Sequence, residues 1–427
     1  MQIGLMRGNT MTVLIAGGGI AGLAMGLTLH QIGIPFRIFE RVKTPKPLGV
    51  GINLQPTAVR ELIELGLSDL LNSVGIRTKD YGFYTKSGVE IWTEPRGLDA
   101  GYLWPQYSVH RGQLQMALLD TLRARAGSDC VVFGRSLQTY VSSHDGVEAT
   151  FQTPAGKETV TGQLLVGTDG VHSAVRAQMY PNEGPPVWGG AVMWRGTTLA
   201  QPFLSGGSMI LAGNDTQRFV SYPISPVDPD TGHALINWIA EKSVDPNAQV
   251  SKEDWNREVG TDQFLNDFND WVFDWLDVPK LIEGAQAVYE YPMVDREPVQ
   301  CWTDGCATLI GDAAHATYPV GSSGASQAIL DARILGAKLQ SRGVGTDAAI
   351  AYEDIVRPMA NRVTLANRGN GGPDAIMQMA QDRCGGDFSK LDALLPYAER
   401  AAHALSFKKL AGLEVGEINN RASIIAS

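Results

Sequence analysis

Thr12-Val-Leu-Ile-Ala-Gly-Gly-Gly-Ile-Ala-Gly-Leu-Ala-Met-Gly26 is the stretch of sequence that decides the fold. Its apolar, partly β-branched beginning predicts a short buried strand, which the glycines end and a helix follows. The glycines have the spacing Gly17-x-Gly19-x-x-Gly22. In that order they suit a tight turn, the close approach of a pyrophosphate and the close packing of a helix on a strand.

The residues that follow the glycines support dinucleotide binding. Ile20 and Ala21 begin the predicted helix, whose free N–H groups and positive dipole end attract an anion. Phe36-Arg-Ile-Phe39 has the pattern of a second strand, and Glu40 follows it, 18 residues after Gly22. A carboxylate in this place usually accepts hydrogen bonds from an adenosine ribose. Strand, turn, helix and acid together predict a Rossmann-like α/β domain.

The same stretch could be mistaken for a signal peptide or a membrane anchor. The span from Thr10 to Phe36 carries no charge, and Arg7 precedes it. However, it contains six glycines, and Glu40-Arg41 follow at the end of the next strand. Both features are unfavourable for a long apolar helix. Residues 1–10 are expected to be a loose leader.

Composition and charge are those of an ordinary globular chain with a large core. Of 427 residues, 44% are apolar and 19% charged, which suffices for two domains. The formal charge is −10, and no basic cluster is present, so we expect no binding to nucleic acid or membranes. The four cysteines are too scattered for a disulfide scaffold, and Cys301 and Cys306 lack a second ligand pair for a metal. We expect a cytoplasmic protein without a metal.

The pattern along the chain predicts a second sheet threaded through the first domain. A hairpin is expected at Tyr81–Tyr84 and Val89–Trp92, and mostly antiparallel strands follow Pro181. Further expected elements are a helix over 57–71, a strand over 159–165, helical stretches over 255–276, a long helix over 347–367 that contains Pro358, and a helical tail. Parallel βα units interrupted by antiparallel strands favour an α/β domain with an inserted domain.

Two later loops indicate which dinucleotide is bound. Asp169-Gly170 and Gly311-Asp312 each follow a predicted strand, and a helix begins near Ala325. An aspartate at a strand end can bind the hydroxyls of a polyol chain. The N-terminus of a helix after Gly324 suits the pyrimidine edge of a flavin, where reduced flavin is negative. These features favour FAD over NAD, although Asp312 could also be an ordinary helix cap.

Three motifs together resemble a known enzyme family. They are the Gly17 motif, GTDGVHSAVR and GDAAHATYPVGSSGASQAILDA. In combination they are similar to those of the single-component FAD-dependent aromatic monooxygenases of the para-hydroxybenzoate hydroxylase type (group A). Within that family, LGVGINLQPTAV, YSVHRGQLQM, MWRGTT and YPMVDREP are most similar to the phenazine-modifying members that act on 5-methylphenazine-1-carboxylate. The likeness covers about residues 11–370; the tail departs, and Ser322-Ser323 is this sequence's own version of the loop.

The resemblance implies a role for each motif residue. The fold would be a Rossmann-like FAD-binding domain with an inserted, mostly antiparallel substrate domain and C-terminal helices. The expected FAD-binding segments are 1–79, 109–180 and 300–370; the substrate segments are 80–108 and 181–299, and the tail is 371–427. The implied cofactor residues are Gly17, Gly19 and Gly22 with Ile20 and Ala21 (pyrophosphate), Glu40 (ribose), Arg41 (adenosine), Arg111 (flavin side), Asp312 (ribityl chain), Gly321, Gly324 and Ala325 (flavin ring), and Asp169 and Gly170 (FAD and transiently bound NAD(P)H).

The implied chemistry places few demands on the protein. NAD(P)H would reduce FAD, O2 would add to give a C4a-hydroperoxyflavin, and one oxygen atom would pass to an electron-rich ring. No catalytic side chain is predicted, because the protein orients the reactants and excludes water. The pocket needs apolar walls with a few polar anchors, and the candidates are Trp194, Arg195, Tyr222, Tyr291, Tyr318 and Pro319. Arg195 could hold a carboxylate, or could be part of a salt bridge; the aromatic residues could belong to the core, and His315 is expected to be structural.

Other functions stay open at this point. The same cofactor chemistry could serve epoxidation, decarboxylative hydroxylation or another polycyclic or heteroaromatic substrate. A flavin halogenase is disfavoured because no Trp-x-Trp-x-Ile-Pro stretch is present. A non-redox binding protein, such as a lipid-carrying escort, is disfavoured by the intact Gly311-Asp312 loop. The expected partners are an aromatic small molecule and O2, and the expected state is a monomer or a homodimer.

Overall fold

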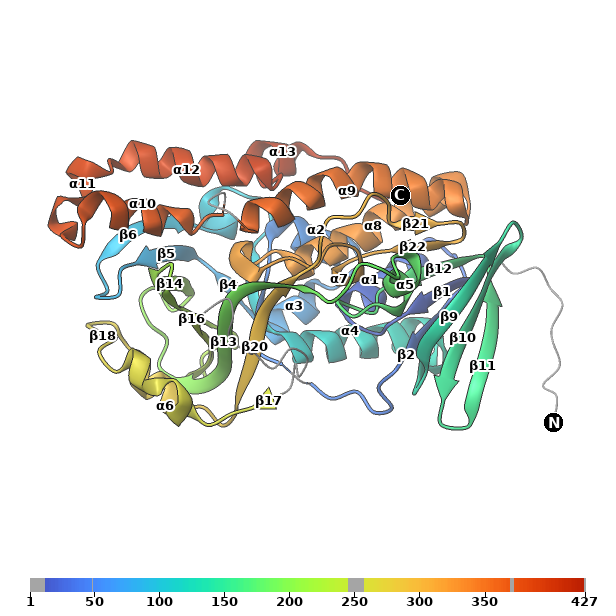
Figure 1. Cartoon of the computed structure of the whole chain (residues 1–427), viewed down its shortest axis with the longest axis horizontal. Helices are drawn as coiled ribbons and strands as arrows, with labels where there is room; N and C mark the ends of the chain where they lie inside the picture. The colour runs from blue at the N-terminus through green and yellow to red at the C-terminus, as the bar shows by residue number, and fades with distance from the viewer. Residues whose placement is uncertain (1–11, 48, 245–256, 369–371, 426–427) are drawn as a thin grey trace.

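The structure is a computed structural model that describes residues 12–47, 49–244, 257–368 and 372–425. Two large β-sheets occupy its centre, and helices from the last quarter of the chain extend along one side of both (Figure 1). The fold class predicted from the sequence is confirmed, since the molecule combines a parallel sheet, an antiparallel sheet and C-terminal helices. The domain limits given above stay a prediction.

The first sheet is parallel except at one edge. Its described strands are β1 (Val13–Ala16), β2 (Phe36–Glu40), β8 (Val131–Phe133), β12 (Leu164–Gly167), β21 (Thr303–Asp304) and β22 (Ala307–Leu309). Their order is β21-β22-β12-β1-β2-β8, and only β21 and β22 pair antiparallel. All four residues of β1 are apolar and buried, as expected for a central strand covered on both faces.

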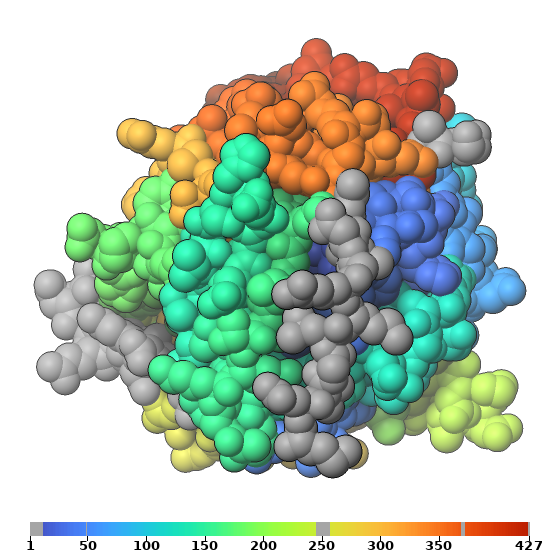
Figure 2. Space-filling model, turned by 90° about the vertical axis from the view of Figure 1, so that its right-hand side faces the viewer, coloured from blue at the N-terminus to red at the C-terminus, as the bar shows by residue number. Residues whose placement is uncertain are grey.

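Different layers cover the two faces of this sheet. The covering elements are the helices α1 (Ile20–Gln31), α4 (Arg111–Ala126) and α8 (Gly324–Arg342), and the antiparallel strands β9 (Ser136–Ser143), β10 (Gly146–Thr153) and β11 (Gly156–Gly162). Gly26 of α1 lies against Ile38 of β2, whereas the next residue, Phe39, stacks on Phe151 of β10 with 4.3 Å between the ring centroids. Successive residues of a strand point to opposite faces, so the helices and the small sheet lie on opposite sides. Figure 2 shows the small sheet on the surface below α8 and α9.

The second sheet carries the residues of the proposed substrate domain. Its described strands are β5 (Asp80–Tyr84), β6 (Glu90–Pro95), β13 (Val187–Ala200), β14 (Ser208–Asn214), β15 (Gln217–Pro223), β16 (Ala234–Ser243), β17 (Arg257–Glu258) and β20 (Val288–Asp295). The order is β17-β20-β13-β16-β15-β14-β5-β6, and every pair except β14 with β5 is antiparallel. The predicted hairpin is confirmed as β5 and β6.

C-terminal helices cover part of this sheet. The helices are α9 (Thr346–Arg368), α10 (Ala375–Cys384), α11 (Leu391–Leu394), α12 (Tyr397–Leu410) and α13 (Val415–Asn420). Ile376 and Met377 of α10 pack in one apolar cluster with Tyr81 and Phe83 of β5. The predicted long helix with an internal proline is confirmed as α9. None of the helices in the described ranges is long and apolar enough to cross a membrane.

Three sequence predictions of local structure are wrong. Residues 57–71 form two helices, α2 (Pro56–Glu64) and α3 (Ser68–Val74), because Gly66 between them has a left-handed φ of 72°. The predicted strand 159–165 is divided between β11 and β12. Residues 261–277 form short 3-10 turns and a two-stranded ribbon instead of helices. The Asn and Asp residues of this segment favour turns, and its aromatic side chains fill a core without helical spacing. Residues 255 and 256 lie outside the described residues.

Candidate functional site

The first glycine loop connects β1 to α1 and leaves room for a ligand. A Cβ on Gly22 would lie 2.0 Å from the carbonyl oxygen of Gly17, and one on Gly17 would lie 2.6 Å from that of Thr168. A Cβ on Gly19 would meet nothing within 4 Å. Ile20 and Ala21 begin α1 without a side-chain cap, so their N–H groups have no intrahelical acceptor. The loop has the open space and the donors that a pyrophosphate needs.

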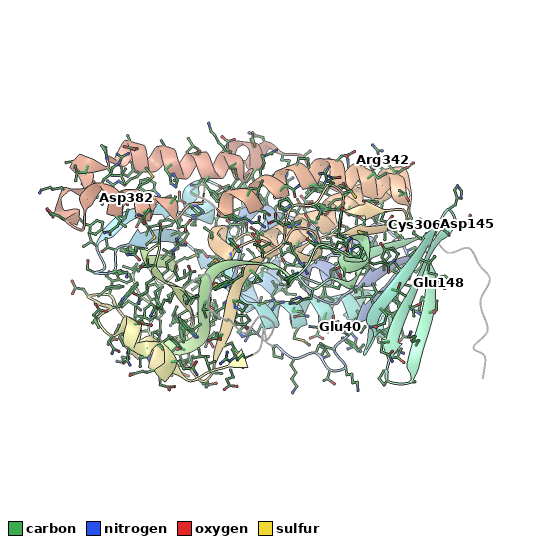
Figure 3. All side chains as sticks on the ribbon, viewed as in Figure 1. Glu40, Asp145, Glu148, Cys306, Arg342 and Asp382 are labelled. Carbon is green, nitrogen blue, oxygen red and sulfur yellow. The ribbon has the colours of Figure 1, made fainter. Side chains whose placement is uncertain are left out.

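Glu40 lies at the end of β2, beside this loop (Figure 3). Its Oε2 accepts a hydrogen bond from the Gly18 N–H at 2.6 Å, and its Oε1 accepts one from the Val42 N–H at 2.8 Å. The carboxylate therefore holds the loop in shape as well as standing where a Rossmann fold binds a ribose. Arg41 follows on the surface.

One carboxylate oxygen of Asp169 accepts a hydrogen bond from the start of a helix, and the other has no partner among the described residues. Its Oδ2 accepts a hydrogen bond at 2.7 Å from the N–H of Ala174, the first residue of α5 (Ala174–Met179). Its buried Oδ1 has no hydrogen-bond partner among the described residues, and burial raises the pKa of the carboxyl group. Gly170 has a left-handed φ of 79°. A buried acceptor without a donor indicates a ligand donor at this place.

Asp312 lies where the first and third loops meet. It begins α7 (Asp312–His315), directly after Gly311, whose φ is 61°. A Cβ on Gly311 would lie 3.2 Å from the Cβ atoms of both Ala21 in α1 and Ala328 in α8. The Asp312 side chain is exposed and makes no hydrogen bond with the described residues. Its carboxylate is thus available to a ligand that extends from the pyrophosphate loop.

The loop before α8 presents an uncapped helix N-terminus. Gly324 and Ala325 begin α8, the preceding Ser323 makes no side-chain cap, and a Cβ on Gly324 would meet nothing within 4 Å. Gly321 lies in a 3-10 turn, and Ser322 has an unusual left-handed φ of 48° for a residue with a side chain. The free N–H groups and the dipole of this long helix suit the negative edge of a reduced flavin.

His315 is structural, as predicted. Its Nε2 lies 2.6 Å from Oδ2 of the fully buried Asp331, and the same oxygen accepts a hydrogen bond from the Gly311 N–H. Burial alone lowers the pKa of an imidazole, but the attraction of Asp331 outweighs burial and raises the pKa of His315. The pair braces the loop that presents Asp312.

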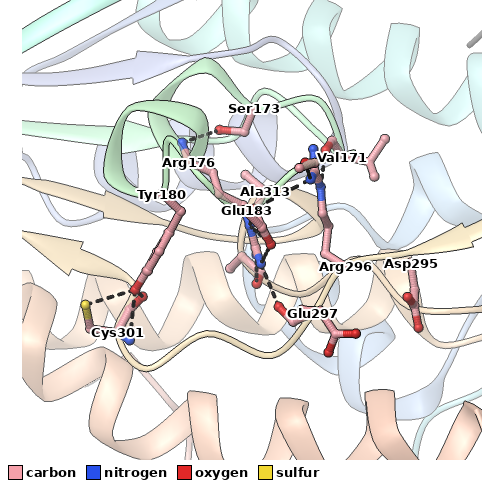
Figure 4. Close-up of polar contacts among 12 residues, drawn as sticks. Val171, Ser173, Arg176, Tyr180, Glu183, Asp295, Arg296, Glu297, Cys301 and Ala313 are labelled. Carbon is pink, nitrogen blue, oxygen red and sulfur yellow. Dashed lines mark hydrogen bonds and ion pairs between the residues drawn. The ribbon is translucent and has the colours of Figure 1, made fainter. Parts of the chain in front are cut away.

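Arg176 connects the second loop to the third, a role that the sequence reasoning missed (Figure 4). Its guanidinium donates hydrogen bonds to the carbonyl oxygens of Ala313 at 3.2 Å, Ala314 at 2.6 Å and Glu297 at 2.7 Å. It also lies 2.5 Å from the Glu183 carboxylate, and its side chain is 1% exposed. The arginine stands in the GTDGVHSAVR motif, but only the folded chain shows what it contacts.

Arg195 is a half-buried cation on the face of the second sheet that meets the first domain. Its Nη2 donates a hydrogen bond at 3.1 Å to the carbonyl oxygen of Gly51, which begins β3 (Gly51–Leu54), and its guanidinium lies 5.7 Å from the Tyr291 ring. Burial lowers the pKa of Arg195, and the nearby positive charge of Arg111 lowers it further. Tyr222 and Tyr291 raise the pKa, but by less than burial lowers it. Nε is buried and unpaired, and no carboxylate pairs with the guanidinium in the described part of the chain. The structure therefore brings Arg195, Tyr222, Tyr291 and Arg111 together.

Asn237 also belongs to this group, and the sequence reasoning missed it. Its Oδ1 accepts a hydrogen bond from the Gly51 N–H at 2.7 Å, while its Nδ2 has no partner among the described residues. A Cβ on Gly51 would lie 2.7 Å from the side chains of both Asn237 and Tyr222. Gly51 is therefore the point of closest contact between β3 and the second sheet.

The structure does not bring Trp194 to this face. It neighbours Arg195 in β13 and so points to the other side of the sheet. There it stacks on Phe264 at 4.6 Å between centroids, and its Nε1 donates to Glu290 Oε2 at 3.1 Å. Trp194 belongs to the apolar cluster on the outer face.

Tyr318 and Pro319 are in the loop between α7 and α8, opposite the inner face of the sheet. A Cβ on Gly189 of β13 would lie 2.8 Å from the Tyr318 ring, which packs with Met193 and Met293. Burial raises the pKa of Tyr318 to about 12. Pro319 is exposed and begins the turn that leads to Gly321.

These residues fit FAD. The open space at Gly19 suits the pyrophosphate, Asp312 and the unpaired Oδ1 of Asp169 offer acceptors to hydroxyl groups, and the N-terminus of α8 suits the flavin ring. Within the ranges that the structure describes, no group of His, Cys, Asp and Glu side chains could hold a metal ion, and the cysteines are free thiols.

Comparison with known proteins agrees with this geometry. A family model described as an FAD binding domain matches residues 10–366. The phenazine 1,6-dicarboxylic acid hydroxylase of Lysobacter antibioticus is 42% identical over 361 residues, which are 83% of this chain and 89% of that protein. The aurachin C monooxygenase/isomerase of Stigmatella aurantiaca is 32% identical and aligns over 87% of this chain and 90% of its own.

Solved structures show the same fold. The Klebsiella pneumoniae HpxO structure, a complex with FAD and uric acid, superposes with a TM-score of 0.72. It covers 96% of this chain and 97% of its own at 23% sequence identity. At that identity the likeness concerns the fold alone.

Proposed function

Since the chain belongs to the FAD-dependent aromatic hydroxylases of group A, and is an FAD-dependent monooxygenase, we propose that it hydroxylates a planar aromatic acid with NAD(P)H and O2. A phenazine-1-carboxylate is the lead substrate. The family assignment removes the non-redox binding protein and the halogenase from the alternatives. The exact substrate and the fate of its carboxyl group are part of the proposal.

The single observation that carries the proposal is the guanidinium of the half-buried Arg195, whose buried Nε has no hydrogen-bond partner among the described residues. A buried guanidinium normally has a carboxylate partner, because desolvation of an unpaired charge costs several kcal/mol. Among the described residues the guanidinium contacts the Gly51 carbonyl oxygen and the Tyr291 ring, and the one charged neighbour that affects its pKa is a second cation, Arg111. A substrate carboxylate bound at Nε and Nη would supply the missing charge in bidentate geometry.

The surroundings of Arg195 favour a flat apolar ligand. Met193, Ile239, Met293 and Tyr318 form one apolar cluster on the same face of the sheet, with Tyr291 packed against it. Methionine and tyrosine side chains offer adaptable contact to an aromatic ring system. The hydroxylase that is 42% identical to this chain acts on a phenazine, which favours the same class of substrate here.

The overall reaction consumes one NAD(P)H and one O2. Bound FAD supplies the redox chemistry, in which one oxygen atom enters the ring as a hydroxyl group and the other leaves as water. With loss of the carboxyl group as CO2, the same reaction takes up one additional proton. The protein's part is to hold the ring at the flavin through Arg195 and to keep water out, since no side chain has to act as a nucleophile.

Other outcomes of the same chemistry remain alternatives. Epoxidation or hydroxylation of another heteroaromatic compound would use the same apolar face. The relative that is 32% identical is named a monooxygenase/isomerase, so relatives of this chain use the fold for more than ring hydroxylation.

The test compares phenazine-1-carboxylate with phenazine in NAD(P)H oxidation by the FAD-loaded enzyme. In the wild type the acid should have the lower KM. Arg195→Met should raise the KM for the acid about thirtyfold or more, as expected for truncating a buried charge pair, and leave the KM for phenazine nearly unchanged. Arg257→Met, on exposed β17 of the same sheet, is the matched control. Equal KM values for both compounds in wild type and variant would remove Arg195 from substrate recognition.

A further inference from the structure

A polar pocket lies on the inner face of the second sheet, away from Arg195. Its volume is about 200 Å³. Residues from the sheet, the α7–α8 loop and the C-terminal helices line it, among them Arg218, Glu241, Met293, Tyr318, Asn367 and Asp374. Tyr318 and Met293 belong to the apolar cluster next to Arg195, so this pocket adjoins the proposed substrate face.

Two acceptors in the pocket, on Glu241 and Asn367, have no hydrogen-bond donor within the described ranges. The Glu241 side chain is 13% exposed, and its ion-pair partner in the described part of the chain is Arg218, whose Nη1 lies 3.9 Å away, too far for a hydrogen bond. Burial raises the pKa of Glu241 to about 7. Asn367 is 6% exposed, and its Oδ1 has no partner among the described residues. Its Nδ2 donates to Thr317 Oγ1 at 3.1 Å and to the Tyr318 carbonyl oxygen at 3.2 Å, which fixes Oδ1 as the free atom.

The cations of the pocket are already paired. Arg218 lies 2.6 Å from Asp374 and 3.3 Å from Asp215. Arg368 pairs with Asp295 at 2.6 Å and with Glu297 at 2.9 Å. What the pocket offers to a ligand is therefore acceptor oxygen and excess negative charge. It can bind an N–H or O–H group or a positive charge, and it repels a carboxylate.

Strand register gives the distance between this pocket and Arg195. Arg195 of β13 is opposite Ile239 of β16, Met193 is opposite Glu241, and Ala191 at the pocket is opposite Ser243. Glu241 is therefore two residues, or about 7 Å, along the strand from the position of Arg195, and Ala191 is four residues, or about 13 Å. The apolar side chains of Met193 and Ile239 lie beside these positions, so the inner face has the Arg195 cation at one end and the acceptors of the pocket further along the strands.

We propose that this pocket binds the edge of the substrate opposite its carboxylate and selects a hydrogen-bond donor or a positive charge there. The preferred substrate is then a monocarboxylate with an amino, hydroxyl or cationic group on its far ring, and a dicarboxylate is disfavoured. This inference rests on the proposed function for the carboxylate end. Glu241 and Asn367 are the residues that determine specificity at the far end.

The experiment titrates the FAD-loaded enzyme at about pH 8, above the pKa of Glu241, with phenazine-1-carboxylate, 6-aminophenazine-1-carboxylate and phenazine-1,6-dicarboxylate, and follows the flavin absorbance. 6-Aminophenazine-1-carboxylate should bind at least as tightly as phenazine-1-carboxylate. The dicarboxylate should bind at least about tenfold more weakly than phenazine-1-carboxylate. The isosteric variant Glu241→Gln should bring the dicarboxylate to within about threefold of the monoacid. The control Glu283→Gln, on α6 (Val278–Glu283) at the outer face, should keep the wild-type order.

A dicarboxylate that binds the wild type as tightly as the monoacid overturns the inference, as does a Glu241→Gln variant that keeps the wild-type discrimination. Equal KM values for phenazine and phenazine-1-carboxylate, in the test of the proposed function above, would be a separate result. It would remove the anchor at Arg195, and thus the proposed function, while the comparison of the three groups at position 6 still reports on the pocket.

Discussion

Asp312→Ala should leave a folded protein that binds FAD about ten- to a hundredfold more weakly. Asp312 is exposed and makes no hydrogen bond within the described ranges, so its removal takes away no such native contact. The free energy of unfolding of the FAD-free protein should change by less than about 1 kcal/mol, the most that a first-turn acid contributes on a surface helix. A lost charge-assisted hydrogen bond to the ligand costs about 1.5–3 kcal/mol, and about 1.4 kcal/mol corresponds to tenfold in Kd.

The assay is titration of the FAD-free protein with FAD, followed by quenching of flavin fluorescence, together with thermal unfolding without FAD. Asp145→Ala is the control, since Asp145 is 98% exposed at the tip of the β9–β10 turn, at the outer end of the small sheet (Figure 3). The control should bind FAD as the wild type does. An Asp312→Ala protein with the same Kd as Asp145→Ala would refute the role given to this carboxylate.

Two further predictions concern residues that support the site. Glu40→Ala should weaken FAD binding and also lower stability by about 2 kcal/mol, because the N–H groups of Gly18 and Val42 lose their acceptor; an unchanged Tm of the FAD-free protein would contradict this. The pKa of His315 is raised above its ordinary 6.5, so the pair with Asp331 contributes fully below that pH and is lost as the pH rises through the folded value. His315→Gln should therefore flatten the decline of the free energy of unfolding, measured in urea, as the pH rises above about 6.5; a decline equal to that of the wild type would contradict the assignment.

The cofactor loops were predictable because each is a local pattern. Gly17, Gly22 and Glu40 are close in sequence, and their spacing alone implies strand, turn, helix and acid. The structure gives the physical reason for two of them, since any side chain at Gly17 or Gly22 would collide with backbone. Asp169 and Asp312 follow strands whose carboxyl ends meet at one edge of the parallel sheet.

The substrate face could not be predicted because its contacts span long stretches of sequence. The hydrogen bond between Gly51 and Asn237 joins residues 186 positions apart. Because side chains alternate along a strand, the sequence shows that Trp194 and Arg195 point to opposite faces of the sheet. Only the stacking of Phe264 on Trp194 shows which of the two residues packs in the outer apolar cluster. Arg176 and Glu241 have ordinary neighbours in the sequence, but each is influenced by a segment more than a hundred residues away: Arg176 by Ala313 and Glu241 by Asp374.

The measurement that tests the central claim most directly uses ¹⁸O2. FAD-loaded protein is incubated with NAD(P)H and phenazine-1-carboxylate under ¹⁸O2, and the aromatic product is analysed by mass spectrometry. We predict that NAD(P)H oxidation accelerates when the acid is added and that the product contains one ¹⁸O atom, with or without loss of CO2. A product without ¹⁸O, or a bound flavin that NAD(P)H does not reduce in the presence of the acid, would contradict the proposed reaction.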